Sequence, residues 1–248
     1  MQRPVNPFFI LLSCLIASAL WACQPSGSEQ GVPASRSTDS SQHHSDSGDE
    51  DTAGPATNAP VKEKEKEMYE NTNRMVWQKP DLVIDMMGDL ENKTVADIGA
   101  GTGFFAKRLA ENAEKVIAID IDQRFLNYID SIKVLEMPAA QQQRLETRLA
   151  EPDNPMLKPG EADVILIVNT FMYIRNKESY LATLKQSLTE DGQLFIIDFK
   201  KKRTDIGPPS DIRLPLFQIE QMLYDAGYRN IDANDTALDY QYIIRAQK

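Results

Sequence analysis

The feature that most limits how this chain can fold is a glycine-rich turn from Asp97 to Gly103, with three glycines at alternate positions. The apolar run Thr94–Ile98 before it predicts a buried strand, and Phe104–Asn112 after it has the spacing of an amphipathic helix. Glycines let the backbone turn tightly and let a ligand approach it closely. The start of the following helix presents free N–H groups. The segment therefore predicts a strand, a ligand-binding turn and a helix in succession.

Strand and helix patterns alternate after this turn, which is typical of a doubly wound parallel sheet. Two late runs, Tyr228–Ala233 and Tyr240–Arg245, are joined by a short connector without a helix. They favour an antiparallel hairpin at the sheet edge, which differs from a plain dinucleotide-binding fold. We expect a turn at Asp191–Gly192. The other expected strands are Val116–Asp120, Arg144–Leu149, Ala162–Val168 and Gln193–Phe199, and the other expected helices are Gln123–Leu135, Lys177–Leu188 and Pro215–Ala226.

The residues before the expected domain have a different composition. Arg3 and the N-terminal amine precede the uncharged apolar run Phe8–Ala22, which is shorter than the roughly 20 residues of a spanning helix. This pattern predicts a signal peptide over residues 1–22. Residues 23–67 are rich in Ser, Gly, Pro, Asp, Thr and Ala, which predicts a disordered tether. The folded domain is expected over residues 68–248.

The end of the first apolar run, Leu20 to Cys23, resembles the lipobox of bacterial lipoproteins, although Trp21 departs from its usual small residue. The resemblance implies that Cys23 is lipidated and anchors the chain to a membrane. Gln24 is not the Asp that retains many lipoproteins at the inner membrane. The expected location is therefore the periplasmic side of the outer membrane in a Gram-negative-type bacterium. The alternative is an uncleaved, short membrane anchor.

Composition excludes several classes of chemistry. The expected domain contains no histidine and no cysteine, because these residues stand at positions 14, 23, 43 and 44. Catalysis by Ser-His-Asp or Cys-His groups and zinc sites with imidazole or thiolate ligands are thereby excluded, and we expect no metal. The formal net charge of -10 also argues against nucleic acid as a partner. The oligomeric state is left open.

Two carboxylates near the glycine turn indicate the ligand. Asp97 would repel a pyrophosphate but suits an ammonium group, such as the methionine amine of S-adenosylmethionine. Asp120 ends the next strand, where a carboxylate accepts hydrogen bonds from ribose hydroxyls of either NAD or S-adenosylmethionine. Asp122 is expected to cap the following helix. The GxGxxA pattern from Gly101 to Ala106 leaves an NAD-dependent oxidoreductase as an alternative. Against it, the domain lacks histidine.

From about Met68 to its C-terminus the chain resembles small bacterial class I S-adenosylmethionine-dependent methyltransferases of the UbiE-like type. The resemblance implies a Rossmann-like α/β fold with a seven-stranded, mostly parallel sheet, a C-terminal antiparallel hairpin, and S-adenosylmethionine as cofactor. The segments that carry it are Trp77–Pro80, Val95–Phe105, Glu151–Pro155, Val168–Thr170, Lys200–Pro209 and Asp239–Tyr242.

The resemblance also implies roles for particular residues. Asp97 and the backbone of the glycine turn would hold the methionine part, and Asp120 would bind the ribose while Ile121 packs against the adenine. Glu151, with Asp153 as its rival, would contact the adenine amino group. The expected cofactor-binding positions are Asp97, Gly99, Ala100, Gly101, Gly103, Asp120, Ile121, Glu151, Pro152, Asp153 and Asn169.

The catalytic group is left open, with Asn169, expected beside the sulfonium, and Tyr173 as candidates. Related sequences commonly carry histidine shortly after this Asn, whereas this chain has Met172 and Tyr173. We expect Tyr173 to be a packed aromatic with a satisfied hydroxyl. Asp198 is expected to be a solvated strand end.

Methyl transfer can run largely on positioning, so the missing histidine is compatible with it. The expected acceptor is a small or lipid-like molecule that enters over an N-terminal helix around Met68–Met87. Because S-adenosylmethionine is made in the cytoplasm, a lipoprotein location leaves a second alternative. This is a tethered module that binds the cofactor or acts as a scaffold without catalysis.

Overall fold

The computed structural model describes residues 73–248. The expected signal peptide, the tether with Cys23, and residues 68–72 of the expected domain lie outside the described residues and stay predictions. Within residues 73–248, no helix has both the length and the apolar character that a membrane crossing requires.

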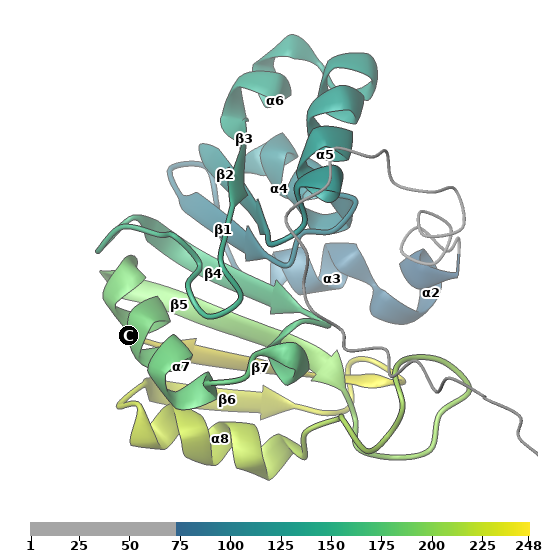
Figure 1. Cartoon of the computed structure of the whole chain (residues 1–248), viewed down its shortest axis with the longest axis vertical. Coiled ribbons are helices and arrows are strands. Elements are labelled where there is room, and N and C mark those ends of the chain that lie inside the picture. Colours follow the sequence, from purple (N-terminus) through teal and green to yellow (C-terminus); the bar gives the residue numbers. More distant parts are fainter. Residues whose placement is uncertain (1–72) are drawn as a thin grey trace, which may run out of the picture. The chain divides into compact units, whose positions relative to one another are not determined.

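A seven-stranded sheet forms the centre of the described part, with the strand order β3-β2-β1-β4-β5-β7-β6 (Figure 1). Neighbours among β1 to β5 run parallel, whereas β7 lies antiparallel to both β5 and β6. The predicted parallel sheet with a terminal antiparallel hairpin is therefore confirmed. The strands are β1 Thr94–Ile98, β2 Lys115–Asp120, β3 Leu145–Leu149, β4 Ala162–Val168, β5 Leu188–Phe199, β6 Arg229–Asn234 and β7 Gln241–Gln247.

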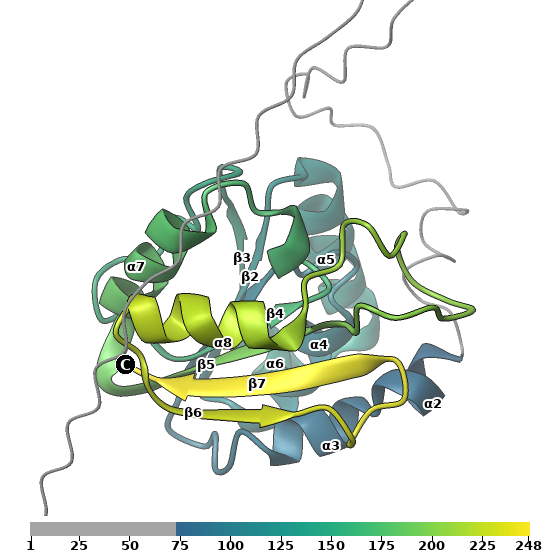
Figure 2. The ribbon, with the colours of Figure 1, turned by 90° about the horizontal axis from the view of Figure 1, so that it is seen from below.

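Helices cover both faces of this sheet. Apolar residues of α3, α4 and α5 belong to the core on one face, and those of α7 and α8 to the core on the other. Figure 2 shows α7 and α8 on the opposite side of the sheet from α2 and α3. The helices are α2 Arg74–Gln78, α3 Pro80–Asp85, α4 Phe104–Asn112, α5 Gln123–Glu136, α6 Ala139–Arg144, the 3-10 turn η1 Phe171–Tyr173, α7 Lys177–Ser187 and α8 Leu216–Asp225.

The central strands are mostly apolar because they are covered on both faces. Ala96 and Val95 of β1 are fully buried in opposite cores, and Ile165 and Leu166 of β4 alternate in the same way. Parallel strands buried on two faces are continuous apolar runs rather than alternating ones. This burial explains why the sequence pattern located both strands.

Two local predictions were wrong. Asp191–Gly192 is no turn, because β5 begins at Leu188 and continues through both residues with an irregularity in its pairing to β4. The described part of Met68–Met87 is two short helices rather than one. Lys79 separates them with a left-handed φ of 46°. Pro80 follows, and proline disfavours right-handed helical geometry in the residue before it.

Candidate functional site

The glycine turn connects β1 to α4 through three residues with positive φ. Gly99 has φ +75°, and a Cβ placed there would lie 2.1 Å from Oγ1 of Thr170. Gly101 has φ +54°, and its added Cβ would meet no atom within 4 Å. The first glycine thus lets the turn pack against the residues after β4. The second leaves an open backbone that a ligand can approach.

Alanine at Gly99 is expected mainly to lower the stability of the fold, whereas alanine at Gly101 is expected mainly to weaken ligand binding. Gly99→Ala should lower the free energy of unfolding by at least about 2 kcal/mol, since it adds a clash to a strained φ. Gly101→Ala should cost only about 1 kcal/mol, the penalty for a left-handed alanine, but should weaken ligand binding. Urea unfolding measures the first effect and calorimetry the second. Equal losses of stability would contradict the different surroundings of the two glycines.

Asp97 is a buried carboxyl next to this turn. Its side chain is 2% exposed, and Oδ2 has no hydrogen-bond partner among residues 73–248. Burial raises the pKa of Asp97 to about 7, although the Arg74 guanidinium and the backbone N–H of Ala106 act in the opposite direction. Buried polar atoms are normally hydrogen-bonded. The free oxygen therefore fits an ammonium group supplied by a ligand, as the methionine amine of S-adenosylmethionine would be.

Asp120 connects the glycine turn to the end of β2. Its Oδ2 accepts from the Gly101 backbone N–H at 2.8 Å, and its Oδ1 accepts from that of Asp122 at 2.9 Å. Burial raises the pKa of Asp120. A carboxylate has about four acceptor positions, so both oxygens can still bind ribose hydroxyls. Asp122 accepts from the Arg124 backbone N–H at 2.9 Å, which confirms it as the cap of α5. Ile121 is 58% exposed beside them.

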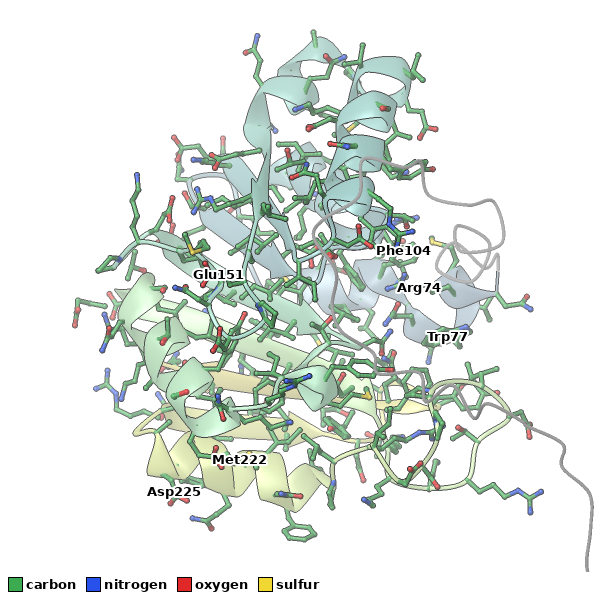
Figure 3. All side chains as sticks on the ribbon, in the orientation of Figure 1. Arg74, Trp77, Phe104, Glu151, Met222 and Asp225 are labelled. Carbon is green, nitrogen blue, oxygen red and sulfur yellow. The ribbon has the colours of Figure 1, made fainter. Side chains whose placement is uncertain are left out.

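The segment after β3 holds the residues expected to contact the adenine. Glu151, Pro152 and Asp153 are all exposed, and Glu151 pairs with Asn154 through two backbone hydrogen bonds of 3.0 and 3.1 Å. The carboxyl ends of neighbouring parallel strands lie on the same side of the sheet. This segment follows β3 and therefore lies on the same side as Asp97 and Asp120. The expected contacts with adenine stay predictions. Figure 3 labels Glu151 together with Arg74 and Phe104.

Asn169 is the first residue after β4 and has a left-handed φ of 57°. Its Oδ1 accepts from Nε2 of Gln241 at 2.5 Å, and Oε1 of Gln241 accepts from Nε2 of Gln78 at 3.1 Å. Oε1 of Gln78 in turn accepts from Nε of Arg74, whose guanidinium lies 4.1 Å from the centre of the Phe104 ring (Figure 3). Both glutamines are fully buried. Both also lie in segments that carried the family resemblance, which assigned them no role.

The structure corrects two expectations, one in η1 after β4 and one at the end of β5. Tyr173 is not packed, because 61% of its side chain is exposed. Asp198 is not solvated but fully buried, because it lies on the same face of β5 as Ile196, which α7 and α8 cover. Its Oδ2 accepts from the Met172 backbone N–H at 3.1 Å, and Oδ1 has no partner among the described residues. Burial raises the pKa of Asp198 to about 8. The strand-end pattern alone could not reveal this burial.

Metal binding has no candidate site among residues 73–248. These residues hold no group of three or more His, Cys, Asp or Glu side chains that could bind a metal. A surface hollow of about 470 Å³ is lined by Asp85, Leu90, Glu111 and Arg144 among others. It lies near the start of β1, away from the glycine turn, and Arg144 there donates to backbone carbonyls at the end of α4.

The sheet order and the glycine turn define the S-adenosylmethionine-dependent methyltransferase fold. Residues 96–194 match a family model described as a methyltransferase domain. The chain is also similar in structure to an S-adenosylmethionine-dependent methyltransferase from Aquifex aeolicus. The two are 25% identical with a TM-score of 0.66, over 75% of this chain and 99% of that one.

Two further proteins have a similar sequence or fold. Demethylmenaquinone methyltransferase of Tropheryma whipplei is 26% identical over 148 residues, 56% of this chain and 58% of that protein. The chain thus spans less than two thirds of this curated relative. Phosphoethanolamine N-methyltransferase 2 of Haemonchus contortus, solved with S-adenosylhomocysteine, has a TM-score of 0.57 and 13% identity, over 69% of this chain and 52% of that one. The family match and the Aquifex aeolicus structure support S-adenosylmethionine as the cofactor.

Proposed function

We propose that this chain is an S-adenosylmethionine-dependent methyltransferase that acts on a small-molecule or lipid-like acceptor. The observation that carries the proposal is the free, buried Oδ2 of Asp97, in the strand that leads into the glycine turn with its open backbone at Gly101. A buried carboxyl oxygen without a hydrogen bond lowers the stability of the fold unless a ligand supplies the missing donor. The methionine ammonium would supply the missing donor.

The chain's own residues would then bind and orient the reactants. Asp97 and the backbone of the glycine turn hold the amino-acid part, Asp120 holds the ribose, and the exposed Ile121 offers an apolar surface to the adenine. The cofactor supplies a methyl group on a sulfonium, which needs no covalent enzyme intermediate. Catalysis then consists mainly of fixing the acceptor in line with that methyl group and excluding water. This fits a domain without histidine or cysteine.

We test the cofactor site by calorimetric titration of the full chain, held in detergent, with S-adenosylmethionine and S-adenosylhomocysteine. The expected result is micromolar binding that falls at least tenfold in Asp120→Ala, because the ribose loses its carboxylate partner. Urea unfolding of both proteins serves as the control for folding. If a folded chain binds neither ligand, the enzyme proposal fails and the tethered scaffold takes its place.

The acceptor is proposed to enter over α2 and α3. Three apolar side chains are exposed there, Met75 at 40%, Val76 at 73% and Leu82 at 39%. The name of the Tropheryma whipplei relative, demethylmenaquinone methyltransferase, also points to a lipid-like molecule. Replacing all three with serine should lower binding of a 1-naphthol probe by about tenfold, since apolar contact area is lost. Binding of S-adenosylhomocysteine by the same variant measures the cofactor site separately. Unchanged probe binding would argue against this entry route.

Anchoring to a membrane through Cys23 belongs to the same proposal, with residues 68–248 as the catalytic domain. The support is the lipobox-like segment in the sequence. Labelling cells with a radioactive fatty acid should mark the chain but not its Cys23→Ser variant. Fractionation of the membranes should place it in the outer membrane. An unlabelled chain would favour the uncleaved anchor instead.

A further inference from the structure

Three side-chain amides connect α2 to the end of β4 in a defined direction. An arginine side chain carries only donors, so the atom of Gln78 that faces Nε of Arg74 has to be the oxygen. Nε2 of Gln78 then faces Oε1 of Gln241, and Nε2 of Gln241 faces Oδ1 of Asn169. The oxygen and nitrogen of an amide are otherwise hard to tell apart. Here the guanidinium fixes the orientation of all three.

Asn169, the last amide of this hydrogen-bonded series, has an unused N–H donor. Oδ1 of Asn169 accepts the bond from Gln241, whereas Nδ2 of Asn169 has no hydrogen-bond partner among residues 73–248. Asn169 is half-buried, so this group lies between the buried network and the solvent. The next residue, Thr170, lies against Gly99 of the glycine turn. The free N–H group therefore stands close to the proposed cofactor site.

We propose that Nδ2 of Asn169 donates a hydrogen bond to an oxygen of the methyl acceptor. The acceptor class is then hydroxylated or carbonyl-bearing molecules, bound through a phenolate, enolate or carbonyl oxygen, and not amines. This inference rests on the proposed function, because it names the substrate class of the same site.

The preference follows from hydrogen-bond direction. An amine nucleophile would bring its own N–H donors toward the N–H donors of Asn169, and neither group would find an acceptor. Sites built for one hydrogen-bonding pattern strongly reject ligands that leave a buried polar group unpaired. An oxygen anion accepts the N–H of Asn169 instead, and bonds to charged groups are the stronger ones. Gln78, Gln241 and Arg74 act as positioning residues for this donor.

Reversing the direction of the network tests the inference. In Gln241→Glu the ionised carboxylate can only accept, so Gln78 keeps its bond while Asn169 has to turn Nδ2 toward Glu and present Oδ1 to the site. Because position 241 is fully buried and burial favours the protonated carboxyl, all three proteins are compared above pH 8. Gln221→Glu makes the same substitution on the exposed surface of α8 and serves as the matched control. Full chain labelled with ¹⁵N-asparagine reports on the Asn169 side-chain amide, whose signal is assigned by its loss in Asn169→Asp.

Exchange of these amide protons with water should be at least tenfold slower in Gln241→Glu than in the unaltered chain and in Gln221→Glu. Equal exchange rates in the three proteins would overturn the assigned direction. This readout needs neither activity nor cofactor. A chain that fails to bind S-adenosylhomocysteine would therefore refute the proposed function without deciding the direction of the amides.

Binding of two matched probes tests the substrate class. 1-Naphthol and 1-naphthylamine share one ring system and differ in the group that would face Asn169. With S-adenosylhomocysteine present, the unaltered chain should bind 1-naphthol at least fivefold more tightly and shift its Asn169 amide signal. The preference should invert in both Asn169→Asp and Gln241→Glu, because each variant presents an acceptor oxygen to the probe. Equal affinities, a preference for the amine, or no binding of either probe would overturn the assignment.

Discussion

Replacing Asp97 with Asn is expected to weaken S-adenosylhomocysteine binding by about 100-fold at pH 7.5. The unaltered side chain offers a buried oxygen without a partner, and a hydrogen bond between a carboxylate and an ammonium contributes about 1.5–3 kcal/mol. The amide keeps the shape of the carboxyl but carries no charge. Calorimetry of both proteins measures the change. Asp225→Asn, an exposed substitution on α8, should bind like the unaltered chain and is the control.

The same substitution should also remove a pH dependence. Burial raises the pKa of Asp97 to about 7 in the free protein, and an ammonium ligand favours the ionised form. Binding therefore releases a proton at acidic pH, and affinity should fall about tenfold for each pH unit below 7. Titrations between pH 5.5 and 7.5 should show this slope in the unaltered chain and a nearly flat profile in Asp97→Asn. The same slope in both proteins would assign the titration to another group.

Asp198→Asn is expected to change how stability depends on pH. The carboxyl is fully buried with one unpartnered oxygen, and burial raises its pKa from 3.8 to about 8. The charged and titratable groups that influence it or are influenced by it are Lys177, Tyr173 and Tyr242. The nearby lysine opposes the shift and does not cancel it. The folded protein therefore holds a proton here that the unfolded chain has lost above about pH 4.

The sign of the effect follows from this difference in bound protons. A pKa that is raised on folding stabilises the protein fully below the unfolded value, and this stability is lost as the pH rises through about 8. The full loss amounts to about 6 kcal/mol, because each pKa unit corresponds to about 1.4 kcal/mol, and about 4 kcal/mol of it falls between pH 5 and pH 8.5. Asn cannot ionise, so the variant should gain stability relative to the unaltered chain between pH 5 and pH 8.5.

Urea unfolding at these two pH values measures the change. The difference between the two proteins cancels contributions from other groups, such as Glu161, whose pKa Arg148 lowers to about 2. Asp97 also has a raised pKa and changes the pH dependence of stability in the same direction. Because Asp97 is present in both proteins, its contribution cancels in the difference as well. Parallel pH profiles of the two proteins would show that Asp198 is already ionised at neutral pH.

The sequence by itself determined the elements whose residues interact locally or are buried along their whole length. β1, α4 and β4 have the bounds that apolar runs and the glycine turn predict. The terminal hairpin followed from two apolar runs with no helix between them. Asp97 and Asp120 stand at the ends of two strands that were expected to be parallel. The carboxyl ends of parallel strands lie on the same side of a sheet, so the two carboxylates could be placed together. Each inference used a period or a spacing that is visible within a short window.

Only the tertiary structure decided what surrounds the side chains at that edge. Gln78 and Gln241 are 163 positions apart, and Gln241 and Asn169 are 72 apart, yet they form one hydrogen-bonded chain. Asp198 is the penultimate residue of β5, but its burial depends on packing against elements elsewhere in the chain. Such contacts carry no local periodicity, because β7 is placed beside β5 by folding of the whole sheet. The hydrogen-bonding character of the site therefore appears only in three dimensions.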